Sequence, residues 1–317
     1  MTVAPETGRA GSLTPCARHR SAEVTLLLIA AIWGTTFALL RDVMRVLHPF
    51  DVMALRFSIA AVIVALICAP RLGRMRRIWL WDGVRTGVFL AVGYLTQVLG
   101  LQTTASARSA FITSMALVFV PFAAYAIQRA RTGIGETIGV VLAASGLILF
   151  YADVGLSFRS GDLWTLGCAV AFAIQIVYTN IAAKRSDPIV VSAIQMIVAA
   201  AFGWVLVLGR GGLAIPIVAI PWAKLLYLAV IATALIVALQ TWALGRVDPV
   251  RAAILFTTEP IFAAIFAAAA YGEGMTSRER VIGNASRHMG DDLPTLYREI
   301  CGIQARCLAR VFDLGRA

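Results

Sequence analysis

The chain has few charged residues, three histidines and five cysteines, and these scarcities exclude several classes of protein. Charged residues make up 14% of the 317 residues and hydrophobic residues 60%, against about 25% and about 45–50% in a soluble domain. The cysteines at positions 16, 68, 168, 301 and 307 lack metal-ligand spacing, so we expect no metal site. No G-x-x-x-x-G-K-[ST] loop occurs, so we expect neither ATP-driven activity nor a cofactor.

The apolar residues are concentrated in nine blocks of 17–23 residues. The blocks are 24–40, 52–69, 84–102, 109–128, 135–151, 162–182, 189–208, 222–244 and 250–271. About 20 apolar residues in a helix cross a hydrocarbon core of about 30 Å. A lipid-exposed span must be helical, and none of the blocks alternates polar and apolar residues as a barrel strand does. The pattern predicts an all-α integral membrane protein.

Basic residues lie mostly between the apolar blocks, which argues against nucleic acid binding despite a net charge of +11. With the N-terminus in the cytoplasm, the inner segments hold 12 Lys and Arg residues and the outer loops hold 5. Cytoplasmic loops carry the excess of Lys and Arg, so we expect a cytoplasmic N-terminus and multi-pass insertion in the inner (plasma) membrane. The lipid bilayer is then one partner of the chain.

The two halves of the chain are related by an internal repeat. A shift of 139 residues places His48-Pro49 on Asp187-Pro188, Val120-Pro121 on Glu259-Pro260, and 31–34 on 170–173. A shift of 143 places Gln97 on Gln240 and Arg108 on Arg251. A unit with an odd number of helices puts its second copy upside down, and inverted repeats around a midplane cavity are a transporter architecture.

Several motifs, in their order along the chain, resemble the EamA-type members of the drug/metabolite transporter superfamily. They are Ala31-Ile32-Trp33-Gly34-Thr35-Thr36-Phe37, His48-Pro49-Phe50 with Leu55-Arg56-Phe57, Ala105-Ser106-Ala107 with 110–114 and Val120-Pro121, Gly161-Asp162-Leu163, and Glu259-Pro260-Ile261-Phe262 with Tyr271-Gly272-Glu273. The resemblance covers about residues 24–280. It implies a ten-helix fold of two inverted five-helix repeats, and a solute such as an amino acid, a related metabolite or a drug.

The family pattern breaks off near residue 280. A tenth apolar helix is expected after 277–279, but an arginine-rich stretch follows, so about nine spans are present. We interpret the segments as a disordered cytoplasmic tail (1–23), a first repeat (24–151), an incomplete second repeat (162–280) and an atypical basic tail (281–317). A frameshift or gene truncation would explain that tail, and a genuine variant with an extracytoplasmic tail is the alternative.

Polar and aromatic side chains inside the apolar blocks are the first candidates for solute contact, since burying polar groups in lipid is costly. The candidates are Trp33, Thr36, Arg56, Tyr94, Gln97, Gln175, Tyr178, Gln240 and Glu259. Tyr94 and Gln97 lie about one turn apart and share a helix face, as do Gln175 and Tyr178. The amides predict a polar lumen suited to a zwitterionic or neutral polar solute, although each could instead bond between helices.

Four of the candidate residues each have two interpretations. Arg56 either meets a solute carboxylate in a cavity or snorkels to the outer interface. Glu259 either binds a proton or a solute amine, or caps backbone groups freed by a proline kink. Pro121 and Pro260 are candidate hinges, because proline inside a helix removes a hydrogen bond, and a static bend is the alternative.

These features predict a secondary transporter or exporter of small metabolites, such as amino acids or related polar solutes, working by alternating access. It would bind a small-molecule substrate and act as a monomer or homodimer. No catalytic residues are expected, since His19, His48 and His288 lie outside the apolar blocks. The alternatives are a non-functional truncated remnant and a membrane-embedded lipid-modifying protein.

Overall fold

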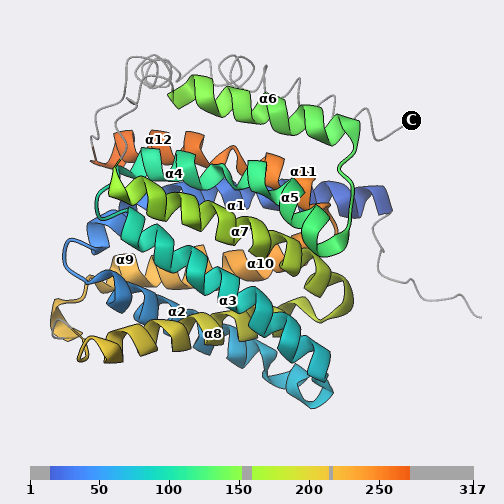
Figure 1. Cartoon of the computed structure of the whole chain (residues 1–317). Coiled ribbons are helices and arrows are strands. Elements are labelled where there is room, and N and C mark those ends of the chain that lie inside the picture. Colours follow the sequence, from blue (N-terminus) through green and yellow to red (C-terminus); the bar gives the residue numbers. More distant parts are fainter. Residues whose placement is uncertain (1–14, 152–158, 214–216, 272–317) are drawn as a thin grey trace, which may run out of the picture.

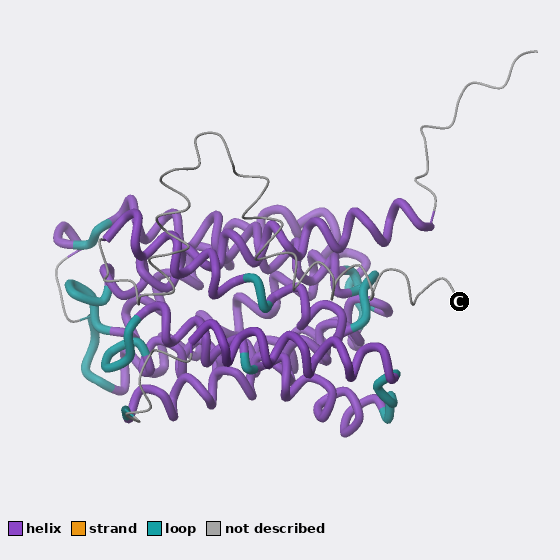
Figure 2. The backbone as a smooth tube through the Cα atoms, turned by 90° about the horizontal axis from the view of Figure 1, so that it is seen from above, coloured by secondary structure: helices purple, strands orange, loops and turns teal. Residues whose placement is uncertain are grey.

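The structure, a computed structural model, describes residues 15–151, 159–213 and 217–271. All regular secondary structure in these ranges is helical (Figure 2). The elements are α1 (Pro15–Val43), α2 (Pro49–Cys68), η1 (Ala69–Arg74), α3 (Arg77–Gly100), α4 (Ser106–Ser114), α5 (Ala116–Gln128), α6 (Ile134–Tyr151), α7 (Ser160–Arg185), α8 (Pro188–Gly209), η2 (Ile217–Ala219), α9 (Trp222–Leu226), η3 (Tyr227–Leu235), α10 (Ile236–Leu244), α11 (Pro249–Phe256) and α12 (Glu259–Tyr271).

Each predicted apolar block coincides with helix. Within the described ranges, six helices are long and apolar enough to cross a membrane: Ser21–Val43, Pro49–Arg71, Arg108–Gln128, Ser160–Arg185, Pro188–Gly209 and Trp222–Leu244. The blocks 84–102, 135–151 and 250–271 correspond to α3, α6 and the interrupted pair α11–α12. The prediction of an all-α membrane fold is confirmed. The first helix begins at Pro15, ahead of the predicted start at 24.

Three helices begin with the same local device, a side-chain acceptor followed by proline. His48 precedes α2, Asp187 precedes α8 and Asp248 precedes α11, and the side chain of each accepts a hydrogen bond from a backbone N–H of the first turn. Proline suits the next position because its missing N–H would have no helical partner there. These caps explain why short sequence motifs mark helix starts so clearly.

The helices run side by side, with α2 and α8 at one edge of the bundle and α6 at the opposite edge (Figure 1). The most extensive packing joins the halves, through α2 against α8 and α3 against both α7 and α8, followed by α1 against α12. Some of these contacts are very close. A Cβ added to Gly203 would lie 2.8 Å from the Cα of Ala54, and one added to Gly34 would lie 2.6 Å from the Cβ of Phe262. Small residues permit such close approach of membrane helices.

Ion pairs join the first half of the chain to the second at both ends of the bundle. At one end, called here the Asp162 end, the pairs are Asp42–Lys224, Asp51–Arg210 and Arg108–Asp162. At the other, the Asp82 end, they are Glu23–Arg251, Arg71–Asp187 and Asp82–Arg185. The Asp82 end therefore brings Arg71 and Arg185 to one face, as the predicted topology requires of the basic segments 74–77 and 184–185.

Two of the membrane-length segments are interrupted midway. The first breaks at Met115, between α4 and α5, and the second at Thr257 and Thr258, between α11 and α12. Pro121 lies inside α5, beyond the break, whereas Pro260 lies in the first turn of α12, where proline is tolerated. The sequence predicts that each proline kinks a continuous helix. The structure instead has two separate helices in each of these segments. Hinge motion at these residues stays a prediction.

One span of the second half contains a π-helical stretch. Residues Tyr227–Leu235 form η3 between α9 and α10, and the Thr233 hydroxyl donates to the carbonyl of Leu228, five residues earlier, at 2.7 Å. A π-helix is rare and usually short, and it often marks a functional position. The predicted missing tenth helix and basic tail, from residue 272 onward, lie outside the described residues.

Candidate functional site

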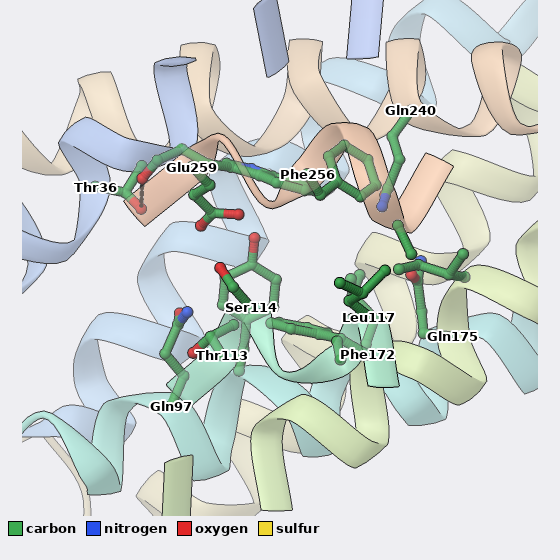
Figure 3. A pocket seen from close by; sticks show the side chains of 16 residues that line it. Thr36, Gln97, Thr113, Ser114, Leu117, Phe172, Gln175, Gln240, Phe256 and Glu259 are labelled. Atoms are coloured by element: carbon green, nitrogen blue, oxygen red, sulfur yellow. Dashed lines mark hydrogen bonds between the residues drawn. The ribbon is translucent and has the colours of Figure 1, made fainter. Parts of the chain in front are cut away.

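A pocket of about 650 Å³, part of it open to solvent, lies among the helices of both halves (Figure 3). We call it the central pocket. Its lining residues are Trp33, Thr36, Leu90, Tyr94, Gln97, Thr113, Ser114, Ala116, Leu117, Phe172, Gln175, Ile176, Gln240, Ala253, Phe256 and Glu259. Pockets with apolar walls and a few polar groups are typical sites for small molecules.

The lining residues come in pairs that the internal repeat relates. The pairs are Trp33 with Phe172, Thr36 with Gln175, Ser114 with Ala253, Leu117 with Phe256, and Gln97 with Gln240. Equivalent positions of two inverted units can surround one space only if the space lies near the axis that relates them. The central pocket is therefore positioned by the repeat itself, and the two interrupted segments, α4–α5 and α11–α12, contribute to its walls.

Aromatic rings form much of the wall. The ring centroids of Trp33 and Phe256 lie 5.4 Å apart, and those of Tyr94 and Phe172 lie 5.3 Å apart. Trp33 is further held by its indole N–H, which donates to the carbonyl of Ala232 in the π-helical stretch at 3.2 Å. Tilted and edge-on ring contacts of this kind are favourable, so the aromatic wall is built from rings that brace one another.

The glutamines of the pocket differ in how fully they are hydrogen-bonded. Gln175 donates to Gln195 at 3.1 Å, and Gln195 in turn donates to Thr241 at 3.3 Å, so Gln175 belongs to an interhelical network. Gln240 is 2% exposed, and its Oε1 accepts no hydrogen bond within the described residues. Gln175 is therefore tied to another helix, whereas Gln240 retains an acceptor that no described residue uses, and solute contact by either stays a prediction.

Glu259 begins α12 and, among the described residues that line the central pocket, is the only charged one. It is 8% exposed, and its carboxylate points into the pocket from the same side as Phe256 (Figure 3). Among the described residues, no hydrogen bond or ion pair reaches this carboxylate. The close contact of Gly34 with α12, 2.9 Å from its added Cβ to the carbonyl of Glu259, fixes the backbone at this point.

Arg56 lies behind the pocket wall. Only 2% of it is exposed, so the interpretation that it snorkels to the interface is wrong. Its Nε donates to the Thr233 hydroxyl at 2.5 Å and its Nη2 to the carbonyl of Ala232 at 3.4 Å. The guanidinium carbon lies 4.7 Å from the ring centroid of Tyr94, which lines the pocket, whereas Arg56 itself does not. No carboxylate in the described part of the chain pairs with Arg56.

The structure thus gathers seven of the nine predicted solute-contact residues around one pocket: Trp33, Thr36, Tyr94, Gln97, Gln175, Gln240 and Glu259. It leaves two outside the lining. Arg56 supports Tyr94, and Tyr178 stacks on Phe89 with centroids 5.5 Å apart. Whether the seven contact a solute stays a prediction. The sequence reasoning missed Phe172 and Phe256, although the repeat aligns Phe172 with Trp33 and would have found it.

The fold and the site define a multi-pass membrane transporter, and the comparisons with known proteins agree. The sequence profile of the EamA-like transporter family matches residues 20–152 and again 159–284. The chain belongs to this family, which confirms the resemblance read from its motifs and the presence of two repeats.

The individual proteins that resemble this chain have sequence identities below 30%. An uncharacterized transporter of Archaeoglobus fulgidus is 28% identical over 271 residues, which cover 80% of each chain. A chloroplastic WAT1-related protein of Arabidopsis thaliana is 28% identical over 184 residues, 52% of this chain and 42% of that protein. A solved crystal structure has the same fold, with a TM-score of 0.67 and 18% identity over 94% of this chain and 99% of the other.

Proposed function

We propose that this protein is a secondary transporter that carries a small polar metabolite through the central pocket by alternating access. The observation that supports it best is a single pocket lined by equivalent positions of two repeats. A solute there contacts both units at once, so its binding can be coupled to their relative movement. The absence of a nucleotide-binding loop from the sequence leaves an ion gradient or the solute's own gradient as the energy source.

The ion pairs at the two ends of the bundle support alternating access. The shift of 139 residues places Glu23 on Asp162 and Arg71 on Arg210, and the shift of 143 places Arg108 on Arg251. Glu23–Arg251 at the Asp82 end is therefore the counterpart of Asp162–Arg108 at the Asp162 end. Matched contacts between the repeats at opposite faces suit a mechanism in which each face opens in turn while the other stays closed.

Orientation and membrane are part of the same proposal. The excess of Lys and Arg supports an orientation with the Asp82 end in the cytoplasm and insertion in the inner (plasma) membrane. Accessibility of single cysteines introduced near 74–77 and 184–185 tests this in intact cells, since both should resist impermeant thiol reagents. Labelling of both sites from outside would reverse the orientation, and labelling of one alone would contradict the inverted-repeat topology.

Transport itself is tested by reconstituting the protein in liposomes and measuring uptake of labelled amino acids and amines. Ala116 lines the central pocket, so Ala116→Trp should fill it and abolish uptake. Ala201 on α8 is exposed on the outer surface of the bundle, and Ala201→Trp is the matched control that should transport normally. Uptake by no form, or equal uptake by the Ala116→Trp protein, would contradict the proposal.

A further inference from the structure

The charge of the central pocket limits what it can bind. Glu259 is the only charged residue of its lining, and it is 92% buried without a partner among the described residues. A buried carboxylate is costly unless something pairs with it. A solute that brings a positive charge and N–H donors would supply that pairing, whereas a solute carboxylate would add a second negative charge.

The nearest buried cation is not available to a solute. Arg56 already donates to Thr233 and to Ala232, and it is not among the residues that line the pocket. Its guanidinium packs against Tyr94, which does line the pocket and is itself held by ring contacts with Phe172 and Phe57. The described lining therefore offers a carboxylate that attracts an ammonium and holds no cation that would attract a carboxylate.

The remaining walls suit the rest of such a solute. Four aromatic residues, Trp33, Tyr94, Phe172 and Phe256, line the same pocket as Glu259. Ring faces attract cations and also contact an apolar body favourably. A carboxylate and aromatic rings thus face the same space, and no cationic side chain is among the described residues that line it.

From this combination we infer that the central pocket selects organic amines carrying an aromatic or apolar body, with Glu259 as the residue that binds the ammonium group. The inference rests on the proposed transport function and narrows its substrate class. It differs from the expectation of a zwitterionic solute, because the second charge of an amino acid would meet no cationic side chain in the pocket lining.

A matched series of compounds tests the charge preference. The thermal unfolding of the purified protein is followed with phenethylamine, phenylalanine and 3-phenylpropionate, and again with tryptamine, tryptophan and indole-3-propionate. Each series keeps one ring system and changes only the charged groups. We expect both amines to raise the melting temperature by at least about 2 °C at saturating concentration, the amino acids to raise it less, and the acids to leave it unchanged.

Three variants test whether Glu259 causes the preference for amines. Glu259→Gln should cancel the shift caused by the amines, and Glu259→Asp, which retains the carboxylate, should keep part of it. Asp248→Asn is the control. It removes a carboxylate from the exposed cap of α11, where asparagine caps equally well, and it should respond to amines like the native chain. The unfolding transition without ligand shows whether each variant is folded.

The outcomes separate this inference from the transport proposal. Acids or amino acids that stabilise the protein as much as amines overturn the amine selectivity, and so does an amine shift that survives Glu259→Gln. Liposomes that take up an amino acid but no amine leave transport standing and overturn the inference. A Glu259-dependent amine shift without uptake of tryptamine supports the site and contradicts transport.

Discussion

The two repeats contribute equivalent positions to the central pocket but different chemistry. The first repeat provides Trp33, Thr36 and Leu117, and the second provides Phe172, Gln175 and Phe256 at the same places. The largest difference falls at the prolines. Val120 precedes Pro121 and is fully buried in a hydrophobic cluster, whereas Glu259 precedes Pro260 and faces the pocket. The repeat therefore determines where the pocket lies, and the differences between the copies determine what it attracts.

Exchanging Val120 and Glu259 between the two repeats is expected to have the largest effect on stability and on solute binding. Val120→Glu would bury a second carboxylate in an apolar cluster without a partner, which should destabilise the protein by about 3–5 kcal/mol. Glu259→Val should keep the fold and lose solute-induced stabilisation. Both are measured by thermal unfolding with and without solute. Because Val120 does not line the pocket, the double variant Val120→Glu/Glu259→Val should not bind solute. Restored binding would contradict the proposed difference between the two repeats.

The matched ion pairs at the two ends should differ in strength. Asp162 accepts from Arg108 at 3.1 and 2.8 Å, from Thr104 at 3.0 Å and from the backbone of Arg159 at 2.9 Å, whereas the Arg251–Glu23 contact is 3.3 Å. We expect Asp162→Ala to cost about 3 kcal/mol of unfolding free energy and Glu23→Ala to cost less, because the contact between Glu23 and Arg251 is longer than those between Asp162 and Arg108. Equal losses in chemical denaturation would show that the two ends are equivalent.

The π-helical stretch distinguishes the third span of the second repeat from α3, its counterpart in the first. Thr233 lies in that stretch and accepts from the buried Arg56, so Thr233→Val should cost about 1–3 kcal/mol by leaving a cationic donor unpaired. Thr86 on α3 is equally buried, but its hydroxyl donates only to the carbonyls of Asp82 and Gly83 in its own helix. Thr86→Val is the control, and a loss as large as that of Thr233→Val would contradict a special role for the π-helical stretch.

The smallest effect is expected at the caps of α2 and α8, where His48 and Asp187 are equivalent. His48 Nδ1 accepts from the backbone N–H of Phe50 at 3.3 Å, which requires a neutral ring. Burial first, and then the charge of Arg210, lower the pKa of His48, although Asp51 opposes them. The folded state therefore binds this proton more weakly than the unfolded state does. The stability that His48 contributes is complete above its unfolded pKa of about 6.5 and is lost as the pH falls through the lower folded value.

His48→Asn retains the acceptor without the titration. Melting temperatures measured between about pH 7.5 and pH 5 should fall slightly more for the native chain than for this variant. Parallel curves for the two proteins would show that the cap carries no pH dependence.

Much of the fold could be predicted from local features of the chain. The apolar blocks coincide with helices because membrane thickness sets their length, and the caps at His48 and Asp187 could be read from an acceptor followed by proline. Seven of the predicted contact residues line one pocket, and the polar ones among them could be predicted because polar side chains rarely face lipid. The partners of Arg56 could not be predicted, since they depend on a π-helical stretch about 180 residues away in the sequence.

The sequence by itself determined that this protein is a helical membrane transporter built from two repeats, because hydropathy, segment length and repeat register are properties of the chain alone. Only the tertiary structure decided which polar side chains share a pocket. The rotation of each helix about its axis is set by its neighbours, and that rotation turns Glu259 into the pocket while it leaves Arg56 outside the lining, in contact with Tyr94.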